Sequence, residues 1–172
     1  MSASKAGNHT SGVPSKAAIG GHPIHPVLIP FPIAFLIGAF LTDLAYWLTG
    51  DPFWARGSFW LVGAGLVGGL LAAVFGLIDF FSIGRAREHL VGWIHFLGNA
   101  TVLILALASL VVRWAEPTAA VLPWGLVLSA AIASILVVTG WIGGELTFRH
   151  MIGVTGHGPS GESQEHGAHE GH

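Results

Sequence analysis

The stretch GSFWLVGAGLVGGLLAAVFGLI, residues 57–78, decides the fold. It runs for 22 residues without an Asp, Glu, Lys or Arg. An α-helix rises about 1.5 Å per residue, so about 20 apolar residues cross the hydrocarbon core of a bilayer, which is about 30 Å thick. Helices in the cores of soluble proteins are rarely so long and so free of charge. The stretch therefore predicts a helix that spans a membrane.

Three more uncharged runs flank this stretch. The first lies between His25 and Asp43 and continues as an apolar segment to Leu48, the next covers residues 89–112, and the last covers residues 117–144. The polar segments between the runs, 49–57 among them, are short, so we expect consecutive helices to be antiparallel neighbours. The chain is therefore predicted to be an all-α integral membrane protein, a four-helix up-down transmembrane bundle.

Composition supports this class and excludes others. Only 9% of the residues are charged, whereas soluble domains carry about 25%. Hydrophobic residues make up 52%, and the mean hydropathy is +0.68. A net charge of -2 and the lack of a basic run argue against nucleic acid as a partner. Because Cys is absent, disulfides, thiolate catalysis, Cys-ligated iron–sulfur clusters and c-type haem attachment within this chain are excluded.

Two polar tails enclose the apolar region. Residues 1–20 are small and polar, so we expect a disordered N-terminal tail and no cleavable signal peptide. Residues 21–154 are predicted to form the four-helix transmembrane domain. We expect residues 155–172 to form a disordered His-rich C-terminal tail, a type of segment that binds metal loosely or simply stays solvated.

Charge bias predicts the orientation of the bundle. Four spans place both chain ends on one side of the membrane, and five cationic residues fall on that side against two on the other: Lys5, Lys16, Arg85, Arg87 and Arg149 against Arg56 and Arg113. An excess of Lys and Arg marks the cytoplasmic side. We therefore expect a multi-pass protein of the bacterial inner (cytoplasmic) membrane with both termini cytoplasmic.

Small residues recur at helical spacing in the apolar runs. Gly65, Gly69 and Gly76 share one face of their helix with Ala72 and Asp79, and Gly140 and Gly144 repeat the spacing in the last run. Small residues let neighbouring backbones approach closely, which drives helix association in lipid. We expect these five glycines to be helix-packing positions.

The segment GHPIHP, residues 21–26, is the densest chemical signal. A residue before proline is pushed out of the α region, so His22 and His25 are predicted to be extended, with Pro26 at the first helical position. The positive end of the helix dipole disfavours a charged imidazole there. A neutral imidazole is able to serve as a metal ligand.

The up-down topology brings more polar side chains to the same end of the bundle. Ionisable groups within spans are costly and mark functional sites. Asn99, four residues after His95, is placed to support that imidazole, whereas His89 and His95 point about 120° apart and are not expected to ligate one centre. The candidate metal or cofactor site comprises seven residues: His22, His25, Asp79, His89, His95, Glu145 and His150.

Several interpretations of this cluster stay open. A b-type haem takes one or two axial imidazoles, whereas non-haem iron, copper or zinc needs His and carboxylate at one point. Alternatively, the histidines and acids pair with each other and with backbone. A pseudo-repeat, His25 with Asp79 and His95 with Glu145, suggests a pseudo-two-fold axis along the membrane normal. At the opposite end, Asp43 is expected to pair with Arg113 or Arg56.

The runs GHPIHPVLIPFPIAF (21–35), LTDLAYW (41–47), GLIDF (76–80) and TGWIGGELTFRHMIGV (139–154) resemble the bacterial membrane family known as domain of unknown function 2231 (DUF2231). The resemblance covers about residues 20–154 and implies a four-helix membrane domain. Some members are joined to Rieske-type iron–sulfur domains, which implies membrane redox chemistry. This chain has a His-rich tail instead of such a domain, so the resemblance implies a separate redox protein as electron partner.

Two functions are therefore expected. The first is a membrane electron-transfer subunit that holds haem b or a non-haem metal at the cytoplasmic end. The second is a non-catalytic membrane scaffold, or accessory subunit of a larger complex, with structural histidines. The expected partners are the lipid bilayer and a redox protein, with a homo-oligomer as an open alternative. No substrate follows from these residues, and whether the chain is an enzyme is left open.

Overall fold

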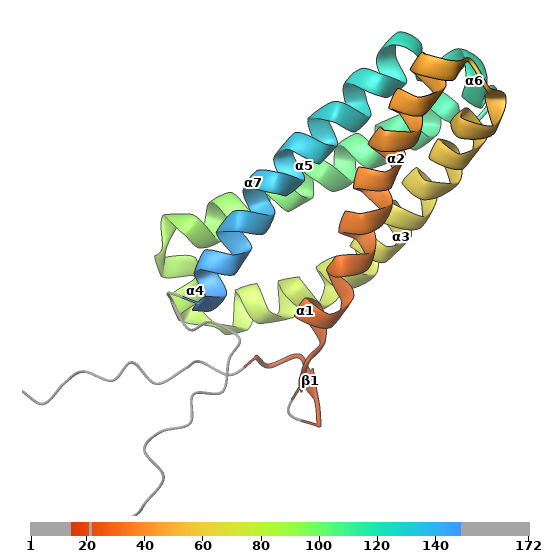
Figure 1. The fold of residues 1–172 in the computed structure, drawn as a ribbon. Coiled ribbons are helices and arrows are strands. Elements are labelled where there is room, and N and C mark those ends of the chain that lie inside the picture. The colour runs from red at the N-terminus through yellow and green to blue at the C-terminus, as the bar shows by residue number, and fades with distance from the viewer. Residues whose placement is uncertain (1–14, 21, 149–172) are drawn as a thin grey trace, which may run out of the picture.

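The computed structural model describes residues 15–20 and 22–148 (Figure 1). A short ribbon, β1 and β2, precedes the helices, and its register pairs Ala18 with Pro23 and Ile19 with His22. The elements in chain order are β1 (Ala18–Ile19), β2 (His22–Pro23), α1 (Ile24–Leu28), α2 (Pro30–Thr49), α3 (Pro52–Ser82), α4 (Gly84–Glu88), α5 (Leu90–Arg113), α6 (Pro117–Ala120), the segment η1 (Val121–Gly125), which is kinked at Leu122, and α7 (Leu126–Phe148).

The predicted fold class is confirmed. In the part of the chain that the structure describes, four helical segments are long and apolar enough to cross a membrane: Ile24–Thr49, Pro52–Ser82, Leu90–Arg113 and Pro117–Glu145. We call α1 to α3 the first hairpin and α5 to α7 the second hairpin. The two hairpins lie side by side, with α3 packed on α5 and α2 packed on α7 (Figure 1).

The turn of the first hairpin is tighter than expected. Polar residues 49–57 were expected to form a loop, but α3 already begins at Pro52. Gly50 ends α2 in the left-handed region at φ 69°, which a glycine adopts without steric cost. Asp51 then caps α3, because its side chain accepts the N–H of Phe53 at 2.9 Å. Polar residues of the segment 52–57 therefore lie in the first turns of α3 and not in a loop.

The start of the first hairpin also differs from the expectation. His22 is extended within β2, as predicted, but His25 lies inside helix α1. A residue before proline is disfavoured in the helical region, so a compensating interaction is needed. The His25 ring supplies one, since its Nδ1 lies 2.7 Å from the Ala72 carbonyl oxygen of α3. A tertiary contact here outweighs a local preference.

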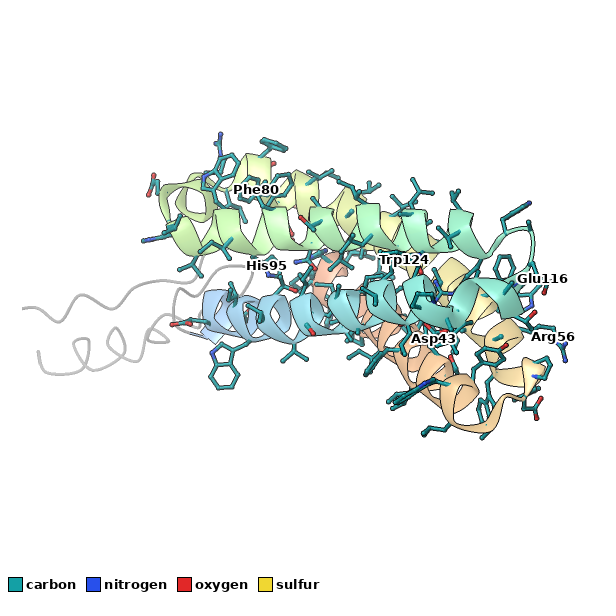
Figure 2. The ribbon with its side chains drawn as sticks, turned by 90° about the horizontal axis from the view of Figure 1, so that it is seen from above. Asp43, Arg56, Phe80, His95, Glu116 and Trp124 are labelled. Carbon is teal, nitrogen blue, oxygen red and sulfur yellow. The ribbon has the colours of Figure 1, made fainter. Side chains whose placement is uncertain are left out.

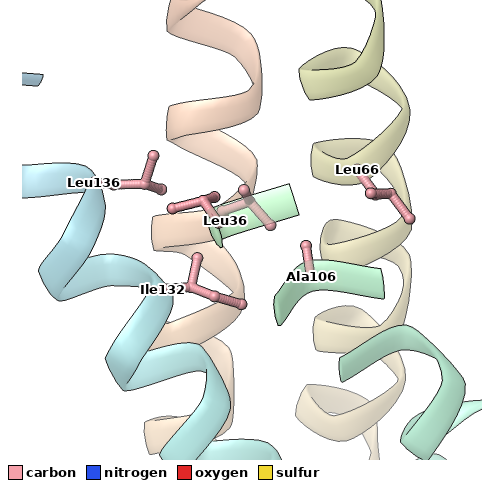
Figure 3. Close-up of a cluster of buried hydrophobic side chains, with 6 residues drawn as sticks. Leu36, Leu66, Ala106, Ile132 and Leu136 are labelled. Atoms are coloured by element: carbon pink, nitrogen blue, oxygen red, sulfur yellow. The ribbon is translucent and has the colours of Figure 1, made fainter. Parts of the chain in front are cut away.

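The core is narrow and the outside of the bundle is apolar. Six buried side chains from all four long helices meet at the centre (Figure 3): Leu36, Leu66, Val102, Ala106, Ile132 and Leu136. Large apolar side chains such as Trp60, Val111 and Val137 point outward and are more than half exposed. An exterior of this kind suits a lipid environment better than water.

Three of the five expected packing glycines make close contacts. A Cβ atom on Gly65 would lie 2.6 Å from Leu36 Cγ, one on Gly69 would lie 2.7 Å from Leu103 Cδ2, and one on Gly76 would lie 2.7 Å from the His25 ring. A Cβ atom on Gly140 or Gly144 would meet no described atom within 4 Å. In α7 the close contact is at Gly143 instead, against the ring of His95.

Candidate functional site

The first candidate side chain is His25, at the start of the first hairpin. Its Nδ1 lies 2.7 Å from the Ala72 carbonyl, and its ring lies against Gly76, one turn further along α3. A carbonyl oxygen only accepts, so Nδ1 carries the proton and donates it. The other ring nitrogen, Nε2, is then the unprotonated one, with its lone pair available.

His95 repeats this arrangement in the second hairpin. Its Nδ1 lies 3.0 Å from the Thr139 carbonyl of α7, and its ring lies against Gly143, one turn further along. By the same argument Nδ1 donates and Nε2 accepts. Asn99 lies where it was expected, with its Nδ2 at 3.3 Å from His95 Nε2 and at 2.8 Å from the His95 carbonyl. The amide therefore donates toward the available lone pair.

Asp79, at the end of α3, binds the first described residues of the chain. Its carboxylate accepts the Ser15 hydroxyl at 2.7 and 2.9 Å, the Lys16 N–H at 2.8 Å and the Ala17 N–H at 3.1 Å. The carboxylate thus fastens residues 15–17, which the sequence suggested as part of a disordered tail, to the end of α3. These donors occupy the oxygens that a metal would need.

The remaining expected site residues are spread over the same end of the bundle. His22 is exposed, and its Nδ1 lies 3.1 Å from the Gly20 carbonyl of its own turn. His89 is the residue that precedes α5, and Glu145 is half-buried near the end of α7. His150 lies outside the described residues. Within the described ranges, no three His or acidic side chains lie together so as to hold a metal ion.

An aromatic cluster joins the two hairpins at this end. Phe80 of α3 stacks on Phe96 of α5, with ring centroids 4.9 Å apart and planes 8° apart. Trp93 meets Phe80 edge-on at 5.0 Å. Offset and edge-on ring pairs of this kind are attractive beyond the area that they bury. We call this half of the bundle, with His25, His95 and Phe80, the histidine end.

A buried ion pair marks the opposite half, which we call the ion-pair end. Asp43 of α2 pairs with Arg113 of α5, which confirms one of the two expected pairings. Both side chains have no exposed area. Arg113 also donates to the hydroxyl and the carbonyl of Ser109. Figure 2 shows His95 and Phe80 toward one end of the bundle and Asp43, Arg56 and Glu116 toward the other.

The sequence did not point to the acceptors of the two histidines. Every residue has a backbone carbonyl, so the residue types at Ala72 and Thr139 do not identify these two carbonyls as the acceptors. A usable signal does exist, because a glycine follows each acceptor by four residues, Gly76 after Ala72 and Gly143 after Thr139. A helix turn that presents a carbonyl above a glycine leaves room for a flat ring.

Comparison with known proteins gives a family and no further relative. No curated protein and no solved structure matches the chain. One family model, described as a predicted membrane protein (DUF2231), matches residues 21–156. The matched range includes His25, Asp43, His95 and Arg113 and ends just beyond the last span. The chain therefore belongs to the DUF2231 family of predicted membrane proteins.

Proposed function

We propose that this protein is a membrane subunit that binds haem b through His25 and His95 and takes part in electron transfer. The observation that carries the proposal is the duplicated imidazole geometry. Each Nδ1–H is fixed by a backbone carbonyl, which orients the ring and leaves Nε2 as the ligand atom. Ligating histidines in metalloproteins are held in this way by a hydrogen bond to the non-ligating nitrogen.

The donor set favours haem over the other candidates. Non-haem iron, copper and zinc sites take three or more protein ligands, and the described residues bring no such group together. A b-type haem takes one or two axial imidazoles, which is the number found here. When bound, such a group supplies one-electron chemistry. The protein's part is to orient two rings and to keep water away from them.

The second candidate is a scaffold whose histidines are structural, and two observations favour it. Each ring lies against a glycine and bonds the neighbouring helix, so it already contributes to packing in its hairpin. In addition, the Asn99 amide occupies the Nε2 side of His95 and would have to turn away for a ligand. The two candidates therefore differ in whether Nε2 is ever used.

Spectroscopy separates the two candidates. The full chain, expressed with iron and haem precursor supplied and purified in detergent, is expected to show a Soret band and about one haem per chain. His25→Ala and His95→Ala should each abolish the band. His22→Ala is the matched control, because that ring is exposed and bonds only its own turn. Haem and metal content must be expressed per correctly folded molecule.

A protein that copurifies with neither haem nor stoichiometric metal contradicts the redox proposal and leaves the scaffold. Loss of the band in His22→Ala as well as in the other two would equally count against a site built on His25 and His95. A band that survives both ligand replacements would place the haem elsewhere in the chain. Each result assigns the histidines to one role.

The orientation with both termini cytoplasmic is part of this proposal. Arg113 belongs to the buried ion pair, which leaves Arg56, exposed in the second turn of α3, as the accessible cation at the end opposite the termini. The charge bias is thus stronger than the count from the sequence. Reporter fusions at both ends of the chain are expected to score cytoplasmic in a bacterial host. An electron partner would then be a separate protein that meets the histidine end from that side.

A further inference from the structure

The two hairpins repeat one another in the positions that they bury. In α2 and α5 the buried side chains match at a constant separation of 70 residues, although the residue types differ. The matched pairs are Pro32 with Val102, Leu36 with Ala106, Ala39 with Ser109, and Asp43 with Arg113. In the second helix of each hairpin four buried positions correspond at a separation of 67 residues, whereas Ala55, Leu66 and Phe80 have no fully buried equivalent. The four pairs are Ser58 with Gly125, Val62 with Ser129, Gly65 with Ile132, and Ala72 with Thr139.

The hydrogen bonds obey the same correspondence. His25 and His95 are 70 residues apart, and their acceptors, Ala72 and Thr139, are 67 residues apart. Because α2 and α5 run in the same direction, the operation that superimposes the hairpins is a pseudo-two-fold rotation about the bundle axis. Parallel repeats of this kind occur in membrane proteins with the axis along the membrane normal. Apart from His25 with His95 and Gly76 with Gly143, the corresponding residues have diverged, so the correspondence emerges mainly from burial and from these hydrogen bonds.

A residue that contacts its own equivalent lies on the pseudo-two-fold axis. Asp43 and Arg113 are equivalents, and they are bonded to each other. If the first hairpin paired with a second copy of itself, Asp43 would face Asp43, and in the second hairpin Arg113 would face Arg113. Like charges in such a place cost several kcal/mol by repulsion and burial. Pairing of the first hairpin with the second is the arrangement that neutralises both.

The surroundings of the pair have diverged to fit this assignment. The Arg113 guanidinium donates to the Ser109 hydroxyl. It also occupies the space that a side chain at Gly125 would need, because a Cβ atom there would lie 2.9 Å from Arg113 Nη2. The equivalents of Ser109 and Gly125 beside Asp43 are Ala39 and Ser58. Three equivalent pairs thus differ together: Asp43 with Arg113, Ala39 with Ser109, and Ser58 with Gly125. In the second hairpin Ser109 and Gly125 accommodate the long Arg113 side chain.

Maximal stability does not explain the pair. Asp43 Oδ1 and Arg113 Nε are buried without a hydrogen-bond partner among the described residues. A buried pair with unmet polar atoms is often less stabilising than apolar residues of similar volume. Buried polar groups are instead a known means of selecting one pairing over its alternatives.

We propose that Asp43 and Arg113 form a heterotypic lock on the pseudo-two-fold axis, which makes the first hairpin pair with the second hairpin and not with another copy of itself. The partner surface is the face of the other hairpin, and the selecting chemistry is one anion against one cation at the same position. This inference does not depend on haem binding.

The first test transplants the lock with its surroundings in the full chain. Asp43→Arg and Arg113→Asp alone each place like charges on the axis and should lower the melting temperature in detergent or prevent recovery of monodisperse protein. The double swap should recover part of the loss. Adding Ala39→Ser and Ser58→Gly should recover more. These changes give the guanidinium introduced by Asp43→Arg the same hydroxyl and the same free space beside a glycine that Arg113 now has.

The matched control adds Ala34→Ser and Ser134→Gly to the double swap, the same chemical changes at exposed positions. This control should not improve on the swap. If the transplanted surroundings give no gain over the swap, or no more than the control, the two sites are not equivalent and the proposal fails. The comparison lies among the swapped variants, so it holds even if the single variants do not fold.

The second test asks whether the lock selects the partner. The chain has no cysteine, so Gly63→Cys and Leu110→Cys place a reporter pair between α3 and α5, where a Cβ atom on Gly63 would lie 3.7 Å from Leu110 Cδ1. A short bis-maleimide should link these cysteines within one chain. In the Asp43→Leu/Arg113→Met background we expect folded protein with a several-fold lower share of linked chains, because a first hairpin paired with its own copy places position 63 opposite position 40, the equivalent of Leu110, which carries no cysteine. A share unchanged from the Asp43/Arg113 background would show that the pair does not select the partner.

Discussion

At the ion-pair end a charged pair joins α2 to α5 and so connects the two hairpins, whereas at the histidine end each imidazole bonds a carbonyl within its own hairpin. The charges have no exposed area, while both histidines are half-buried. Apart from the contacts of Phe80 with Phe96 and Trp93, the hydrogen bonds described at the histidine end lie inside each half. One end therefore connects the two hairpins through buried charges, and the other holds each imidazole within one hairpin.

This contrast has a physical basis. Separating a buried charge pair leaves two unpaired charges in a medium of low dielectric constant, which is costly. A neutral imidazole that leaves a carbonyl loses one hydrogen bond, which in membrane proteins averages about 0.6 kcal/mol. The histidine end is thus the half that is able to rearrange at small cost. The predictions below test that ordering.

The largest expected effect is at the ion-pair end. Arg113→Met leaves Asp43 buried without its cation, and loss of one partner of a buried pair costs about 3–5 kcal/mol. Thermal unfolding in detergent, followed by circular dichroism, should show a large drop in melting temperature. Arg56→Met is the matched control, since Arg56 is exposed and should change stability by less than about 0.5 kcal/mol. Equal melting temperatures for the two variants would refute the contrast between the ends.

The next effect concerns the packing of α3 against its neighbours. Gly65→Ala places a methyl group 2.6 Å from Leu36 Cγ in the central core, and overpacking of this kind costs about 1–3 kcal/mol. Gly69→Leu should be worse, because its Cβ atom already approaches Leu103 within 2.7 Å. The control is Gly140→Ala, where the new methyl group meets no described atom. Chemical unfolding of these variants in mixed micelles would reveal the order, and an unaffected Gly65→Ala would mean that this face does not pack.

The histidine end should respond less. Without added haem, each of His25→Ala and His95→Ala removes the bond from the ring to a carbonyl of its own hairpin, and His95→Ala also removes the contact with Asn99. We therefore expect a loss of about 0.6–1.7 kcal/mol from each, larger for His95→Ala. His22→Ala serves as reference and should be neutral. The measurement is the melting temperature of haem-free protein. A loss of stability as large as that of Arg113→Met would show that the histidines stabilise the bundle as much as the ion pair does.

The smallest effect is expected where Asp79 holds the N-terminal segment. Asp79→Asn weakens the bonds from Ser15, Lys16 and Ala17, and a hydrogen bond to a charged group contributes about 1.5–3 kcal/mol locally. The segment lies outside the four spans, so the melting temperature should hardly change. Amide exchange of residues 16 and 17 should speed up, however, and Asp51→Asn at the other end should leave that exchange unaltered. Unchanged exchange in Asp79→Asn would show that the carboxylate does not hold the segment.

The sequence by itself determined the four spans and the end of the bundle that holds the histidines. Length and charge-free character are properties of consecutive residues, and the bilayer converts them directly into helices. The pairing of Asp43 with Arg113 was also predictable, because two cationic residues, Arg56 and Arg113, lie in the half of the bundle that contains Asp43. The tight contacts at Gly65, Gly69 and Gly76 followed from spacing on a single helix.

Only the tertiary structure decided what the polar side chains do. Spacing within a helix fixes which residues share a face, but it does not fix the rotation or the height of one helix against another. For that reason the helical conformation of His25, the capture of Asp79 by residues 15–17 and the close contact at Gly143 were not foreseen. The same relation between helices brought His25 and His95 into matched settings, since their acceptors are backbone carbonyls on other helices, which no residue type reveals.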